Sequence, residues 1–187
     1  MKMKNDNVYP RYVLWKGIMF PSLEICSLKR NDDGWLMEGS LTAKFRETGQ
    51  TIVYQIFSDC NFNSLSAYIE VVSPWNKKRV DLQLRGGNWF VNGKIREDLA
   101  ECRDVDLELS PATNTLPIRR SAVRIGEKVE LVAAWIRVPD LTVEPLRQSY
   151  ERISETMYLY KSNNFQAKLE VDEIGLVTSY EGVWQKW

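Results

Sequence analysis

The chain has 187 residues, of which 44% are hydrophobic and 27% are charged, a balance typical of a globular protein and not of a disordered or fibrous one. Lys and Arg number 25, as do Asp and Glu, so no long-range positive field attracts nucleic acid or an anionic membrane. Histidine is absent, which excludes Ser-His-Asp and Cys-His relays and histidine-based metal sites. At this length we expect one domain over residues 1–187 with a substantial core.

The N-terminal region and the cysteines predict a cytoplasmic protein. Polar, charged and proline residues interrupt residues 1–20, so this region lacks the apolar segment of a signal peptide. No stretch approaches the ~20 apolar residues that a membrane-spanning helix needs. Cys26, Cys60 and Cys102 form no CxxC pair, and we expect them to be buried thiols in a reducing compartment.

The first part of the chain has the pattern of short strands separated by turns. Apolar and polar residues alternate at the end of 35–45, and 51–57 (TIVYQIF) is rich in β-branched and aromatic residues. A turn is expected between them at Gly49 and Gln50. Residues 66–72 are the next strand candidate, which ends before Pro74.

The middle of the chain continues this pattern. Residues 80–84 alternate, residues 85–88 form a turn, and 89–91 begin another strand. Asn92-Gly93 is the best signal in the sequence for a two-residue hairpin turn. The segment 128–138 (KVELVAAWIRV) is the most apolar strand candidate, and we expect it at the centre of the sheet.

Residues 143–157 are ambiguous between helix and strand. Apolar residues recur there at spacings of three and four: Val143, Leu146, Tyr150, Ile153 and Met157. This spacing favours a helix, but Pro145 would have to sit in its first turn. Residues 165–171 alternate again, and a turn at 172–175 leads into 176–180 as a terminal hairpin.

These patterns predict an all-β protein. Short strand candidates follow one another without regular intervening helices, so we expect a single large curved antiparallel sheet of the incomplete-barrel type. Curvature of this kind protects the sheet edges. One short helix is compatible with the prediction.

The most unusual segment is 104–120 (DVDLELSPATNTLPIRR), which is polar and rich in turn-forming residues. Two prolines restrict its backbone, so a rigid loop can direct Asn114 and Thr115 towards a ligand. Arg119 or Arg120 could then hold an anionic or polyhydroxylated head group through its guanidinium. The alternative is structural: an aspartate at the start of the segment pairs with the arginines and fixes the chain crossing.

Other candidate residues lie outside this segment. Seven tryptophans and eight tyrosines offer flat faces that stack on sugar rings and acyl chains but also fill cores. Trp15, Trp35, Trp75 and Trp89 stand beside charged or turn residues, so we expect exposed aromatic surface there. Glu24, between two apolar residues, is the best candidate for a carboxylate with a raised pKa, unless it faces solvent.

The candidate ligand-binding residues are therefore Asn114, Thr115, Arg119, Arg120, Trp15, Glu24 and Trp89. No P-loop, GxGxxG or GxSxG motif is present, so we expect no nucleotide chemistry, cofactor or metal, and we assign no catalytic residue.

Three segments carry a family resemblance: DVDLELSPATNTLPIRR, AWIRVPDLTVEPLRQSYER and LEVDEIGLVTSYEGVW. Together with the opening LWKGIMFPSLEICSL, they resemble a bacterial family named "Putative glycolipid-binding", once catalogued as a domain of unknown function. The resemblance implies a curved sheet similar in shape to periplasmic lipoprotein carriers, and binding of a glycolipid. It implies no catalytic residues.

Three functional hypotheses follow. The leading one is a non-catalytic protein that binds an amphipathic ligand, such as a glycolipid, on the concave sheet face with its head group near Asn114 and Arg119. A second is an enzyme of the glycosidase type that uses two carboxylates drawn from Glu24, Asp104 and Asp106. A third is an interaction module that uses sheet edges or exposed tryptophans.

Overall fold

The computed structural model describes residues 11–45 and 48–187, and in this part of the chain it contains one sheet of 15 strands. The N-terminal strands are β1 (Arg11–Gly17), β2 (Ser22–Asn31), β3 (Gly34–Phe45), β4 (Thr48–Ser58), β5 (Ser64–Val72), β6 (Lys77–Arg85), β7 (Asn88–Val91) and β8 (Lys94–Ile95). The middle elements are a 3₁₀ helix η1 (Glu97–Leu99), β9 (Asp104–Leu107), a 3₁₀ helix η2 (Ala112–Asn114) and helix α1 (Thr115–Ser121). The C-terminal strands are β10 (Lys128–Ile136), β11 (Val143–Arg152), β12 (Met157–Ser162), β13 (Phe165–Val171), β14 (Val177–Tyr180) and β15 (Trp184–Lys186).

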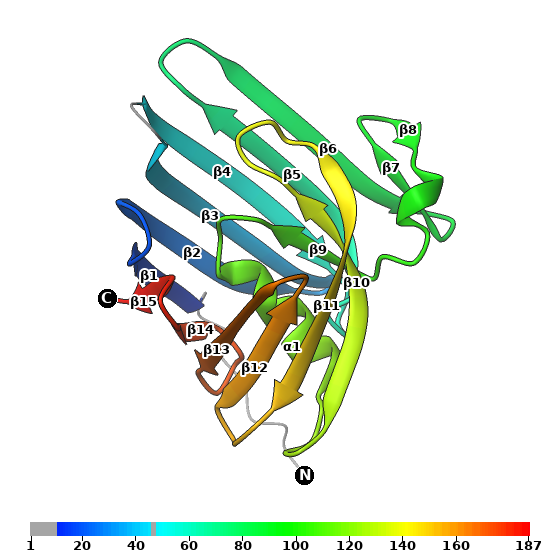
Figure 1. The fold of residues 1–187 in the computed structure, drawn as a ribbon. Helices are drawn as coiled ribbons and strands as arrows, with labels where there is room; N and C mark the ends of the chain where they lie inside the picture. Colours follow the sequence, from blue (N-terminus) through cyan, green and yellow to red (C-terminus); the bar gives the residue numbers. More distant parts are fainter. Residues whose placement is uncertain (1–10, 46–47) are drawn as a thin grey trace.

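The strand order explains the incomplete barrel. From β1 the chain runs outward strand by strand to β8 at one edge, then starts again at the opposite edge with β9 and returns to β15, which pairs with β1. Among the described strands every neighbouring pair is antiparallel except β9 with β10. The sheet curves without closing, and α1 lies within the curve (Figure 1). The predicted fold class is therefore confirmed.

Most strand predictions agree with the structure because the period-two alternation is strong in them. The hairpin prediction is also confirmed: Asn92 and Gly93 have φ values of 50° and 78°, the positive pair that a type I′ turn requires. The turn expected at Gly49 and Gln50 is wrong, since both residues pair with β3. Residues 46–47, between β3 and β4, lie outside the described residues, as do residues 1–10 of the segment in which the sequence predicts no signal peptide.

One prediction about the C-terminal half is corrected, and one ambiguity is resolved. β10 lies beside the edge strand β9, not at the centre of the sheet. The ambiguous segment is the strand β11, in which Leu146, Gln148 and Tyr150 are all buried; a polar residue on the buried face hid the alternation. Pro145 is tolerated because β12 pairs only with Gln148–Arg152, so no strand on that side needs its missing N–H.

The polar loop expected at 110–120 is instead helical. It folds as η2 followed by α1, and Pro117 falls in the first turn of α1, where no N–H donor is needed. The helix ends at Ala122, whose φ of 45° is left-handed. Arg119 and Arg120 therefore project from a helix and not from a strand. No helix in the described residues is long and apolar enough to cross a membrane.

The tryptophan prediction is wrong for Trp15 and Trp89, which are fully buried, and right for Trp75, which is 86% exposed. The indole of Trp15 donates to the Val177 carbonyl (2.6 Å), and that of Trp89 to the Cys102 carbonyl (3.0 Å). Charged neighbours gave a false signal because adjacent strand residues point to opposite faces.

The cysteine prediction needs one correction. Cys26 and Cys102 are buried as expected, but Cys60 is exposed; all three thiols are free. Cys60 lies in the turn between β4 and β5, where the side chain has no sheet face to pack against.

Candidate functional site

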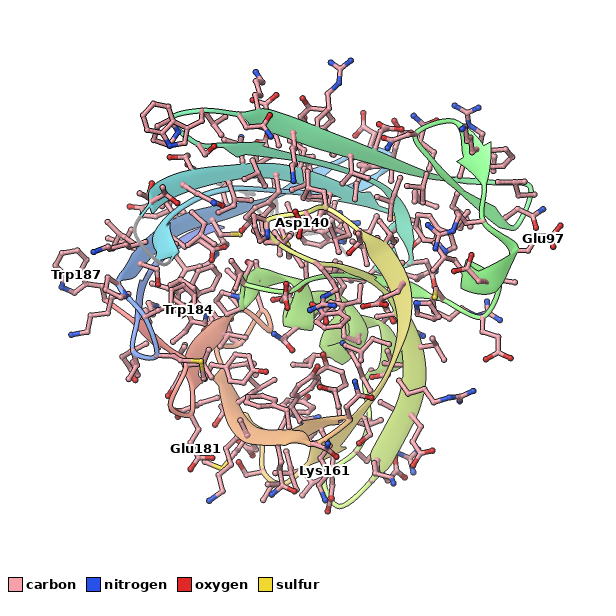
Figure 2. The ribbon with its side chains drawn as sticks, turned by 45° about the horizontal axis from the view of Figure 1, so that its top comes forward. Glu97, Asp140, Lys161, Glu181, Trp184 and Trp187 are labelled. Carbon is pink, nitrogen blue, oxygen red and sulfur yellow. The ribbon has the colours of Figure 1, made fainter. Side chains whose placement is uncertain are left out.

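A cavity of about 530 Å³ lies inside the C-terminal half of the sheet, next to η2. Its lining includes six aromatic residues: Phe20, Trp135, Tyr160, Phe165, Tyr180 and Trp184. In Figure 2 the C-terminal strands curve around this interior, where Trp184 points inward, whereas Trp187 lies at the outer margin. The cavity therefore occupies the concave face that the sequence predicted as the binding face.

Three of these aromatic rings form a wall that is assembled from three consecutive strands. The ring centroids of Tyr160 on β12, Phe165 on β13 and Tyr180 on β14 lie 6.0–6.1 Å from one another, within the range of favourable ring contacts. Phe165 is 38% exposed and Met19 is 63% exposed, so the apolar wall extends to the cavity mouth.

The polar end of the cavity is built around Asp106 and Asn114. Asp106 accepts hydrogen bonds from the Thr113 hydroxyl (2.9 Å) and from the amide of Gln148. Asn114 accepts from the Tyr150 hydroxyl (2.8 Å). Burial raises the pKa of Asp106 to about 6. The hydrogen bonds from Thr113 and Gln148 lower the pKa but do not outweigh burial. Asp106 is thus a partly buried carboxylate that is ionised at neutral pH.

Glu24 lies beyond this polar end, 0% exposed. Its Oε1 accepts hydrogen bonds from the hydroxyls of Tyr54 and Ser110, each at 2.6 Å, and its Oε2 has no partner. Burial raises the pKa of Glu24 to about 8, so the group is largely a neutral acid at neutral pH. The raised pKa predicted from sequence is confirmed, and the solvent-facing alternative is wrong.

The glycine at position 39 makes room for this buried acid. A Cβ on Gly39 would lie 2.2 Å from the ring of Tyr54, so only a residue without a side chain lets the tyrosine reach Glu24 across the sheet. Ser110, the second partner of Glu24, also lines the cavity. Glu24 therefore ties the N-terminal half of the sheet to the segment that forms the cavity's polar end.

Asp104 and Arg120 form the ion pair that the structural alternative predicted. The guanidinium of Arg120 donates two hydrogen bonds to the fully buried carboxylate of Asp104, at 3.0 and 2.7 Å. Burial raises the pKa of Asp104 even though Arg120 opposes this, because desolvation outweighs the pairing. The pair fixes α1 against β9, and Arg120 does not line the cavity.

The remaining predicted residues lie away from the cavity. The guanidinium of Arg119 lies over the ring of Phe62 at 5.2 Å and lines a separate depression with Arg152 and Glu173. Thr115 is buried, and its hydroxyl has no partner. Trp15, Trp89, Glu24, Thr115, Arg119 and Arg120 do not line the cavity; Asn114 does.

The carboxylate set considered for glycoside hydrolysis is not gathered around the cavity. Of Glu24, Asp104 and Asp106, only Asp106 lines it. Glu108, two residues further on, is the second carboxylate of the cavity wall. Its Oε2 accepts from the Val138 backbone N–H at 2.8 Å. In the described residues no group of three His, Cys, Asp or Glu side chains is placed to hold a metal ion.

Sequence reasoning missed Glu108 and the aromatic wall residues Tyr160, Phe165 and Tyr180. Tyr158 and Tyr160 are two residues apart on β12 and both buried, so they share a face. That this face is the concave one depends on the curvature of the sheet. Strand pairing across β12, β13 and β14 brings the rings together.

Comparisons with known proteins agree on the identity of the fold. The family model described as "Putative glycolipid-binding" matches residues 12–186. Among solved structures, the chain is similar to a DUF1089 family protein from Pseudomonas aeruginosa, with 32% sequence identity and a TM-score of 0.80. The similarity covers 89% of this chain and 92% of that chain. No curated protein sequence matches. The family resemblance seen in the sequence segments is confirmed.

Proposed function

The chain belongs to the "Putative glycolipid-binding" family, and from this premise we propose that its internal cavity binds an amphipathic ligand without converting it chemically. The observation that carries the proposal is one cavity of about 530 Å³ with an aromatic wall and a polar end. Its size lies within the ~300–1,000 Å³ of small-molecule sites. Such a cavity suits a ligand with one apolar and one hydrogen-bonding part.

Each end of the cavity has a distinct role in this proposal. Tyr160, Phe165 and Tyr180 contact the apolar part, since aromatic faces pack against both alkyl chains and sugar rings. Asp106 and Asn114 face the head group at the polar end. The exposed apolar side chain of Met19 at the mouth lets the apolar part enter without crossing a charged rim.

Replacing Tyr180 with alanine is expected to weaken binding of octyl β-glucoside about tenfold, measured by calorimetry below the micelle concentration. The reason is the loss of an aromatic contact surface worth about 1.5 kcal/mol or more. Tyr68→Ala is the matched control, because Tyr68 on β5 bonds Glu70 and lies outside the cavity. Equal affinities for the two variants, or no binding by the wild type, would contradict the proposal.

A further inference from the structure

The residues that line the cavity include two carboxylates and neither lysine nor arginine. Asp106 on β9 and Glu108 in the turn that follows this strand both line the cavity. Among the described residues Glu108 has one ion-pair partner, Arg137, whose Nε lies 3.8 Å from Glu108 Oε1. Arg137 also contacts Glu144 at 3.5 Å and lies over the ring of Trp135. Its charge is therefore shared with groups other than Glu108, and Arg137 itself does not line the cavity.

The negative charge of Asp106 acts on the tyrosines of the aromatic wall. Burial raises the pKa of both Tyr160 and Tyr180, and the charge of Asp106 raises them further. The ring faces add their own negative potential. An anionic head group would therefore lose its hydration in a site that repels it.

We propose that the polar end of the cavity binds a protonated amine, so that the ligand is an amphipath with a cationic head group, such as an amino sugar or an alkylamine. This inference rests on the proposed binding function. The ammonium donates charge-assisted hydrogen bonds to Asp106 and Glu108, while the apolar part of the ligand packs against the rings of Tyr160 and Tyr180. The sequence predicted that Arg119 or Arg120 holds an anionic or polyhydroxylated head group. The proposed head group is cationic instead.

The site also has a defined pH range. The groups that face Asp106 are Glu108 and Asp104 from the β9 segment, Tyr150 from β11, Tyr160 from β12 and Tyr180 from β14. Because the pKa of Asp106 is about 6, its negative charge is present above that pH and lost below it. Binding of a cation is therefore expected to weaken as the pH falls through 6.

The experiment compares three probes with the same alkyl chain, namely octylammonium, octyl β-glucoside and octanoate, by calorimetry below their micelle concentrations. At about pH 8 the wild type is expected to bind octylammonium about tenfold more tightly than octanoate. Asp106→Asn should reduce this preference to about threefold or less, and Glu108→Gln should reduce it as well. Asp98→Asn is the matched control, because Asp98 pairs with Arg96 and does not line the cavity. Its sequence neighbour Glu97 lies at the outer margin of the molecule (Figure 2).

The outcomes separate this inference from the proposed function. Equal binding of all three probes, or tighter binding of octanoate or octyl β-glucoside, overturns the amine site and leaves the binding function in place. Binding of none of the probes overturns both. A preference for the amine that survives Asp106→Asn also overturns the inference. Lowering the pH to about 5 should weaken octylammonium binding and leave octyl β-glucoside binding unchanged.

Discussion

Glu24→Gln is expected to remove a pH dependence of stability that the wild type shows between pH 4.5 and about 8. The pKa of Glu24 rises from 4.5 to about 8 on burial in the folded protein. Between these values the folded state binds a proton that the unfolded state releases, so the wild type loses stability as the pH rises. The loss is complete above pH 8 and amounts to about 5 kcal/mol at most.

Glutamine keeps the interactions that matter at low pH. Its Oε1 accepts the hydrogen bonds of Tyr54 and Ser110, and its Nε2 replaces an oxygen that has no partner in the structure. The two proteins should therefore be similarly stable near pH 4.5, and the variant should be several kcal/mol more stable above pH 8.

Urea unfolding of both proteins across this pH range measures the effect. Glu173→Gln provides the control, since that carboxylate is exposed and its replacement should leave the wild-type slope unchanged. Parallel stability curves for wild type and Glu24→Gln would contradict the protonated buried acid.

Arg120→Met is expected to destabilise the fold by about 3–5 kcal/mol, because it leaves the buried carboxylate of Asp104 without its partner. Methionine retains an unbranched side chain in place of the aliphatic part of the arginine, so the loss reports chiefly the missing guanidinium. The double variant Asp104→Asn/Arg120→Met should recover most of this loss, since it removes the unpaired charge as well.

The contrast with an exposed ion pair serves as the control. Lys128 and Glu130 also form a close pair, but on the surface of β10, and Lys128→Met should leave the free energy of unfolding essentially unchanged. If Arg120→Met is no more destabilising than Lys128→Met, or if the double variant is as unstable as the single one, the buried pair does not hold α1 in place.

The sequence predicted the sheet because alternation and turn residues are local signals. Asn92-Gly93 defines its hairpin without help from the rest of the chain. β11 was ambiguous for the opposite reason: the buried Gln148 breaks the apolar pattern, and its burial depends on Asp106, which is 42 residues away. The helical form of residues 112–121 likewise depends on tertiary contacts, among them the Arg120–Asp104 pair.

The candidate site was only partly predictable. Asn114 was identified from the turn-forming segment, and the raised pKa of Glu24 from its apolar neighbours. The aromatic wall was not, because Tyr160, Phe165 and Tyr180 come from strands whose concave faces are set by the curvature of the whole sheet. Trp15 and Trp89 were misassigned since sequence neighbours on a strand do not share a face.

Native mass spectrometry of the protein, purified from the organism that encodes it and kept free of detergent, tests the central claim most directly. The account predicts a mass above that of the chain, and extraction should release an amphipathic molecule with an amine in its polar part. The bound fraction should fall in Tyr180→Ala and stay unchanged in Tyr68→Ala. A clean mass of the chain alone, together with no binding across a panel of neutral, cationic and anionic amphipaths, would contradict it.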